Sequence, residues 1–143
     1  MTPDSLRHRA SRLLSQVTTL SDRLVNDGLG RADARKWHVA TLASLHEHGP
    51  ASQAALSRRT GIYRSDMVAV IGELAARDLV EQAPDPRDRR RHVITITPAG
   101  ERHLRALQTI LDDVHQELLA PLDPAEREQL VHLLTRLLEH HGR

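Results

Sequence analysis

The sequence has no cysteine and no phenylalanine, and Trp37 and Tyr63 are its only two large aromatic residues. Without cysteine there can be no disulfides, thiolate metal sites or thiol redox sensing. So few aromatic rings argue against binding of single-stranded nucleic acid, since that mode stacks bases on aromatic side chains. No apolar run approaches the length of a membrane span, and the first residues lack a signal-peptide core. We therefore expect a cytoplasmic protein with no membrane partner.

The charge is nearly balanced, with a net value of only +1 over 143 residues. A chain of this length is long enough to bury a core of its own, so we expect residues 1–143 to form a single domain. Because the whole molecule is not a polycation, any nucleic-acid site must be a local basic patch.

Apolar periodicity, together with start and stop signals, predicts six helices. The first is a leucine-rich helix over about Pro3 to Asn26, and we expect Gly28-Leu29-Gly30 to break it. The second runs from about Ala34 to Glu47. The others are a short helix between Ser52 and Gly61, one from Arg64 to Arg77, a long one from Pro98 to Leu119, and a last one that Asp123 caps.

A basic hairpin interrupts the helices. Predicted strands Leu79–Ala83 and Val93–Thr97 flank a turn that holds four arginines. These cations repel one another unless an anion lies against them, and duplex DNA presents a closely spaced row of phosphates. Asp85 and Asp88 lie between the arginines, which indicates a shaped tip and not a disordered basic tail.

The two short helices before the hairpin have the spacing of a helix-turn-helix. Ala55 permits close approach, Gly61 permits the sharp turn, and Val70, Ile71 and Leu74 fill the contact. Many helical hairpins match this pattern, but a basic hairpin shortly after it makes the pair much more specific. The predicted fold class is therefore mainly α with a small β-hairpin wing: a winged helix-turn-helix of six helices.

At this point the chain resembles the MarR family of transcriptional regulators (the multiple antibiotic resistance regulators). Segment 52–61 resembles the first helix of the family's DNA-reading pair, and 74–80 resembles the end of its recognition helix. The most specific likeness is the wing, 85–90, followed by Ile96-Thr97-Pro98-Ala99-Gly100.

The resemblance implies a transcriptional regulator, since members of the family are repressors or activators. We expect a repressor that binds a pseudo-palindromic operator in double-stranded DNA as a homodimer. The resemblance assigns residues 34–97 to the DNA-binding lobe, and 3–26 and 98–141 to dimerisation.

Three positions depart from the family pattern. Asp78 replaces the usual glycine after the recognition helix, and aspartate tolerates a left-handed backbone better than most residues. Gly72 and Ala69 replace polar or charged residues inside that helix. These two changes argue against base contacts from its second turn, but they leave the predicted fold unchanged.

Ten residues are predicted to contact DNA. Arg64 begins the recognition helix, where side chains reach base edges. Arg90 either enters the minor groove, which attracts arginine, or pairs with Asp88 and holds the turn closed. Asp66 either accepts the free N–H groups of its own helix or accepts from a cytosine amine. The full set is Ser52, Gln53, Tyr63, Arg64, Ser65, Asp66, Arg87, Arg89, Arg90 and Arg91, of which Arg87, Arg89 and Arg91 are expected at phosphates.

A ligand site is predicted beside Trp37, whose alternative role is core packing. The resemblance implies a crevice between the DNA-binding lobe and the dimerisation helices, lined by the second helix. Trp37, His38 and Thr41 offer an aromatic face, a titratable group and a hydroxyl there. A mostly apolar pocket with few polar groups suits a small aromatic or lipophilic effector.

Other classes of protein fit the sequence less well. Ten histidines suggest a metal, but no His-x-x-x-His pair occurs and His38 is eight residues from His46. We therefore predict no metal and no cofactor. An enzyme needs a nucleophile with a base, a metal or paired carboxylates; we find none of these and predict no catalytic residue. A purely structural helical dimer explains the leucine stripes but not the basic hairpin.

Overall fold

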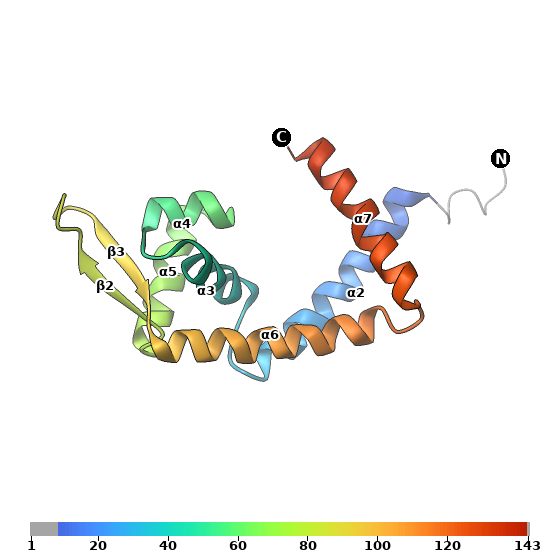
Figure 1. The fold of residues 1–143 in the computed structure, drawn as a ribbon, viewed down its shortest axis with the longest axis horizontal. Helices are drawn as coiled ribbons and strands as arrows, with labels where there is room; N and C mark the ends of the chain where they lie inside the picture. Colours follow the sequence, from blue (N-terminus) through green and yellow to red (C-terminus); the bar gives the residue numbers. More distant parts are fainter. Residues whose placement is uncertain (1–8, 143) are drawn as a thin grey trace.

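The computed structural model of the chain describes residues 9–142. This part of the chain has six helices and a small three-stranded antiparallel sheet, whose strands β2 and β3 lie at one end of the molecule (Figure 1). This arrangement confirms the predicted winged helix-turn-helix class. The helices are α2 (Ala10–Gly30), α3 (Lys36–His48), α4 (Gln53–Thr60), α5 (Arg64–Ala76), α6 (Pro98–Leu118) and α7 (Pro124–His141). The strands are β1 (Ala51–Ser52), β2 (Val80–Pro84) and β3 (His92–Ile96). Residues 3–8, the start of the predicted leucine-rich first helix, lie outside the described residues.

The expected break at Gly28-Leu29-Gly30 is wrong, because α2 continues through Gly30. Gly28 is buried where α2 crosses α6. A Cβ atom at Gly28 would lie 3.0 Å from Cγ2 of Val114 and 3.2 Å from Cγ2 of Ile110. The glycine therefore lets two helices pack closely, and close packing outweighs its low helix propensity.

The wing is part of a three-stranded sheet, in the order β1-β3-β2, and not of an isolated hairpin. β2 pairs with β3 from Val80 opposite Ile96 to Pro84 opposite His92. The strand missed by the sequence analysis is β1, in which Ala51 lies opposite Ile94. Because β1 comes just before α4, it fixes the base of the wing against the start of the helix-turn-helix.

Local signals end and begin the helices of the lobe as predicted. The Ser52 hydroxyl accepts from the N–H of Ala55 and caps α4, and Gly61 ends α4 with a left-handed φ of 76°. Asp78 also has a left-handed φ, of 58°, so aspartate does take the conformation expected at this position. A continuous apolar core lies between α3, α4, α5 and the sheet. It includes Leu42, Leu45, Leu56, Met67, Leu74 and Ile94.

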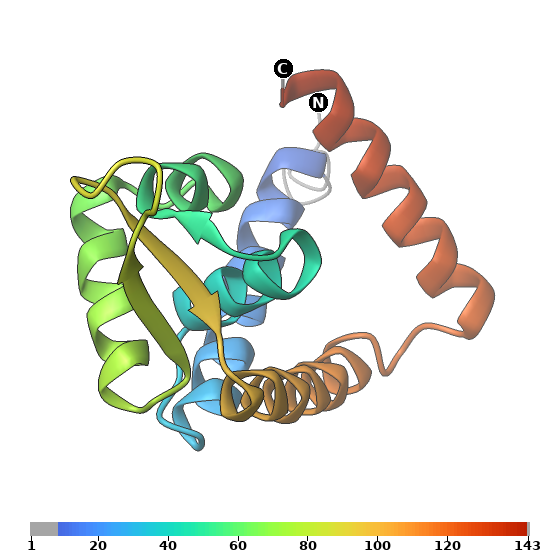
Figure 2. The ribbon, with the colours of Figure 1, turned by 60° about the vertical axis from the view of Figure 1, so that its left-hand side comes forward.

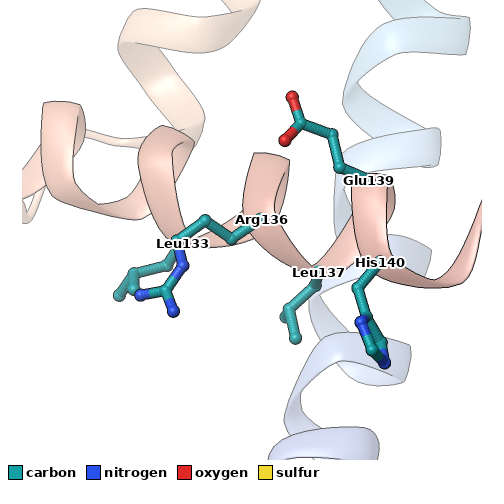
Figure 3. Close-up of a pocket in the computed structure, with 5 residues that line it drawn as sticks. All are labelled: Leu133, Arg136, Leu137, Glu139 and His140. Carbon is teal, nitrogen blue, oxygen red and sulfur yellow. The ribbon is translucent and has the colours of Figure 1, made fainter.

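α6 connects this lobe to α7, which stands apart from the lobe in both ribbon views (Figures 1 and 2). Asp123 and Glu126 form the predicted capping box at the start of α7. Arg127 donates from Nε to the carbonyl oxygens of Leu119 and Leu122 and so holds the turn after α6. No residue of α7 is buried. Figure 3 shows Leu133 and Leu137 projecting from the side of α7 opposite Glu139.

Candidate nucleic-acid interface

Two aspartates shape the tip of the wing. The carboxylate of Asp85 accepts from the N–H of Arg87 at 2.9 Å, and that of Asp88 accepts from the N–H of Arg90 at 3.1 Å. The N–H of Asp85 donates to the carbonyl of Arg91 at 2.8 Å and closes the loop. Such side-chain turns are a local property of aspartate, so these acidic residues order the loop that displays the arginines.

Arg90 forms the pair with Asp88 that was one of the two roles considered for it. Its Nε donates to Oδ1 of Asp88 at 3.2 Å, yet its side chain remains 92% exposed. The side-chain hydrogen bond from Arg90, followed by the one from its backbone N–H, holds the pKa of Asp88 below its ordinary value. An exposed pair of this kind contributes little to stability, so a DNA groove can compete for the guanidinium at small cost.

The wing, the cap of α4 and the start of α5 enclose one concave surface. Its lining residues are Ser52, Gln53, Ala54, Arg64, Gln82, Arg90, Arg91, His92 and Ile94. Five of the ten predicted DNA contacts therefore come together: Ser52, Gln53, Arg64, Arg90 and Arg91. Gln53 also donates from Nε2 to the carbonyl of Arg64 at 3.3 Å, which links the starts of the two helices. Gln82 and His92 were missed, because a strand pattern does not show which of its side chains face a neighbouring helix.

The remaining five predicted contacts lie outside this concavity. Arg87 and Arg89 are exposed on the wing tip, and Tyr63, just before α5, is 80% exposed. Ser65 is exposed in the first turn of α5. Asp66 is half-buried and forms no side-chain hydrogen bond with residues 9–142, and α5 has no side-chain cap. The capping role considered for Asp66 is therefore not seen in this conformation.

A polar network ties the start of α3 to the recognition helix α5. Arg35, just before α3, donates from Nη2 to both carboxylate oxygens of Glu73, at 2.6 and 2.7 Å. The buried ring of His38 accepts at Nδ1 from the N–H of Arg35, so the proton of the neutral ring is on Nε2 and is donated to Glu73 at 2.8 Å. These hydrogen bonds, that of His38 first, lower the pKa of Glu73. Neither Arg35 nor Glu73 was predicted.

The three predicted ligand residues do not share one surface. Trp37 is 39% exposed, lies under the guanidinium of Arg35 at 5.5 Å from the ring centroid, and lines a pocket between α2 and α3. His38 is 5% exposed and engaged with Glu73. Thr41 is fully buried, and its hydroxyl lies 3.8 Å from the sulfur of Met67. Only Trp37 is thus open to a ligand in this conformation.

Several histidines of the described residues have separate partners. His46 lies 2.6 Å from a carboxylate oxygen of Glu101, and the rings of His140 and His141 pack edge to face. Burial, followed by the charges of Arg77 and His38, lowers the pKa of His103. Among residues 9–142 no three His, Asp or Glu side chains gather as they would around a metal ion. No helix in that range is both long enough and apolar enough to span a membrane.

Comparison with known proteins agrees with this geometry. Residues 27–91 match the model of the MarR family. The transcriptional repressor NicR of Pseudomonas putida is 31% identical over 99 residues, which are 69% of this chain and 63% of NicR. The chain thus matches less than two thirds of the length of that relative.

Two solved structures match over nearly all of both chains. A probable transcriptional regulator from Pseudomonas aeruginosa is 31% identical with a TM-score of 0.78, covering 92% of this chain and 98% of its own. BpsR of Bordetella bronchiseptica, whose DNA binding is regulated by 6-hydroxynicotinic acid, is 25% identical with a TM-score of 0.78, covering 91% and 93%. The family model and these relatives agree with the wing and the helix-turn-helix of the structure. The chain belongs to the MarR family of DNA-binding transcriptional regulators.

Proposed function

We propose that the protein is a repressor that binds a pseudo-palindromic operator as a homodimer and releases it when a small molecule binds. The observation that carries the DNA-binding part is the concavity in which Arg64 of α5 meets Arg90 and Arg91 of the wing. Guanidinium groups from two elements converge there, which suits one element reading base edges in the major groove while the other follows the backbone or minor groove.

Dimerisation is supported by apolar side chains that the single chain leaves uncovered. α2 exposes Leu13, Leu14, Val17 and Leu20, and α7 exposes Val131, Leu133, Leu134, Leu137 and Leu138. Uncovered apolar surface on this scale marks an interaction site in a soluble protein. A two-fold dimer in turn selects half-sites about one helical turn apart.

Control by a ligand is supported by the path from Trp37 to the recognition helix. Arg35 contacts the Trp37 ring and also holds Glu73 of α5. A small aromatic ligand at Trp37 that displaces the guanidinium loosens this tie, and an effector acts only by binding the two states unequally. We propose that His38 and Thr41 form the inner wall of this site and open to the ligand as α3 and α5 separate. The regulation of BpsR by an aromatic acid makes small aromatic acids the first compounds to test.

The first test is DNA binding. The purified protein should enrich a duplex from a random pool, with affinity that falls steeply as salt rises. Arg64→Ala should lose about 1–3 kcal/mol on the selected duplex and relax base preference, if Arg64 reads a base. Arg90→Ala should weaken matched and mismatched duplexes alike and reduce the salt slope by roughly one ion.

Arg105→Ala, an exposed charge on α6 outside the concavity, is the matched control and should bind like the wild type. Unchanged affinity and slope in Arg90→Ala would assign that residue to wing structure alone. Failure to enrich any duplex would refute the proposed function. For the direction of control, a reporter gene placed behind the selected operator should be expressed less when the protein is produced; activation would reject the repressor assignment.

A further inference from the structure

Beyond its first turn, the recognition helix is apolar on the side that continues from Arg64. Met67, Val70, Ile71 and Leu74 of α5 are buried in the lobe. On the opposite face Val68, Ala69 and Gly72 are exposed, and Val68 is 57% exposed. Arg64 and Val68 are four residues apart, so they share one side of the helix. Val68 therefore continues the surface on which Arg64 enters the concavity.

The fold gives no reason for a valine at this position. A β-branched residue slightly disfavours a helix, and the Val68 side chain is not buried in the core. Gly72, one turn further on, is equally unexplained, since a Cβ atom there would meet nothing within 4 Å. A glycine inside a helix costs about 1 kcal/mol relative to alanine. Both residues lower the stability of the helix. They leave a surface with only short side chains, which suits close approach of a partner.

The chemistry of this surface limits what it can read. Val68, Ala69 and Gly72 have no side-chain donor or acceptor, so this part of α5 cannot read hydrogen-bonding base edges. The carboxylate of Glu73, in the third turn, is engaged by Arg35 and His38. The one apolar mark that a base pair displays in the major groove is the C5-methyl group of thymine. The arginines beside this face, on α5 and on the wing, favour duplex DNA over an apolar protein surface as its occupant.

We propose that Val68 is a specificity-determining residue that contacts the C5-methyl group of a thymine in each half-site of the operator. The inference rests on the proposed DNA-binding function and adds to it the kind of base read beyond Arg64. The free energy of this contact can also be stated. Burying one methyl-sized group against apolar surface contributes about 0.8 kcal/mol, or about fourfold in affinity.

Replacing thymine by deoxyuridine removes only the methyl group, so it tests the contact directly. Each thymine of the duplex selected from a random pool is replaced in turn, together with its symmetry mate. At one symmetric pair the wild type should bind about fifteenfold more weakly, which is roughly fourfold for each half-site. Val68→Ala should bind the thymine duplex more weakly than the wild type does and should be insensitive to deoxyuridine at that pair, as expected for two groups in contact.

Arg90→Ala is the control variant, because it should weaken binding and yet retain the full deoxyuridine effect. Circular dichroism should show that Val68→Ala keeps the wild-type helix content. The proposal is overturned if no thymine pair responds to deoxyuridine, or if Val68→Ala responds as strongly as the wild type. In either case DNA binding itself still stands. If no duplex is enriched at all, the proposed function fails first, and the assignment of Val68 fails with it.

Discussion

Glycines in this chain differ in what the space around them permits. At Gly100, in the first turn of α6, a Cβ atom would lie 2.1 Å from the carbonyl oxygen of Leu79. That oxygen accepts from the N–H of Thr97, and the Thr97 hydroxyl caps α6. Gly100 is therefore required where α6 begins against the turn between α5 and β2, whereas Gly72 faces open space.

Alanine at these two positions should have opposite effects on stability. Gly72→Ala should raise the free energy of unfolding by about 1 kcal/mol, through helix propensity alone. Gly100→Ala should lower it by about 1–3 kcal/mol, because the backbone must move to admit the methyl group. Urea denaturation at fixed protein concentration measures both changes. Equal effects of the two substitutions would contradict the packing described around Gly100.

The element most directly coupled to the recognition helix is α3. Its tie to α5 is the group of Arg35, His38 and Glu73. The ion pair between Arg35 and Glu73 is about half exposed, so by itself it contributes little. The buried N–H of His38 is different, because removing its acceptor leaves a donor unsatisfied inside the lobe.

Glu73→Ala should therefore lower the free energy of unfolding by about 1–3 kcal/mol, the cost of leaving a buried donor unpaired. Glu73→Gln keeps an acceptor for His38 and should cost less. Thermal and urea unfolding of the two variants give the comparison. Equal losses would show that the charge of Glu73, and not its oxygen atom, is what His38 requires.

The same carboxylate predicts a pH dependence. Hydrogen bonds from His38 and Arg35 hold the pKa of Glu73 below its ordinary value of 4.5. Its contribution to stability is therefore complete above pH 4.5 and is lost as the pH falls through the lowered pKa. Glu73→Gln should lack this loss, so the wild type should lose more free energy of unfolding than the variant on acidification. Parallel pH profiles would reject the linkage.

For the whole molecule, the exposed leucines predict an obligate dimer. Leu133→Gln combined with Leu137→Gln should shift the protein towards monomer, because both leucines project from the same side of α7 (Figure 3). Glu139→Gln, on the opposite side of that helix, should leave the dimer intact. Light scattering at micromolar concentration reads the mass directly. A well-folded wild-type monomer at that concentration would rule out the dimer.

Effector control also belongs to the whole molecule, because it couples two distant sites. A ligand that weakens operator affinity tenfold needs about 1.4 kcal/mol of coupling, and the operator must weaken ligand binding by the same factor. Trp37 is the only tryptophan, so its fluorescence should report binding of aromatic acids or hydrophobic antibiotics. Trp37→Leu should bind an effective ligand more weakly. Unchanged affinity would place the pocket elsewhere, and no response to any ligand would indicate a constitutive regulator.

The sequence by itself determined the features that depend on neighbours within one or two turns of chain. Ser52 and the Asp123–Glu126 pair start their helices, Gly61 ends one, and Asp85 and Asp88 shape the wing, because each acts on backbone groups a few residues away. The helices, the hairpin and the burial of one face of α5 follow from such signals together with apolar periodicity.

Only the tertiary structure decided what lies beside what across the chain. Gly28 was expected to break α2 but packs against α6, and two-residue β1 was missed because its pairing with β3 is not a local property. Arg35 meets Glu73 across 38 residues of sequence, and the hydroxyl of Thr41 is buried against the sulfur of Met67. A periodic pattern tells which face of a helix is buried, but the partner buried against it depends on how the helices pack.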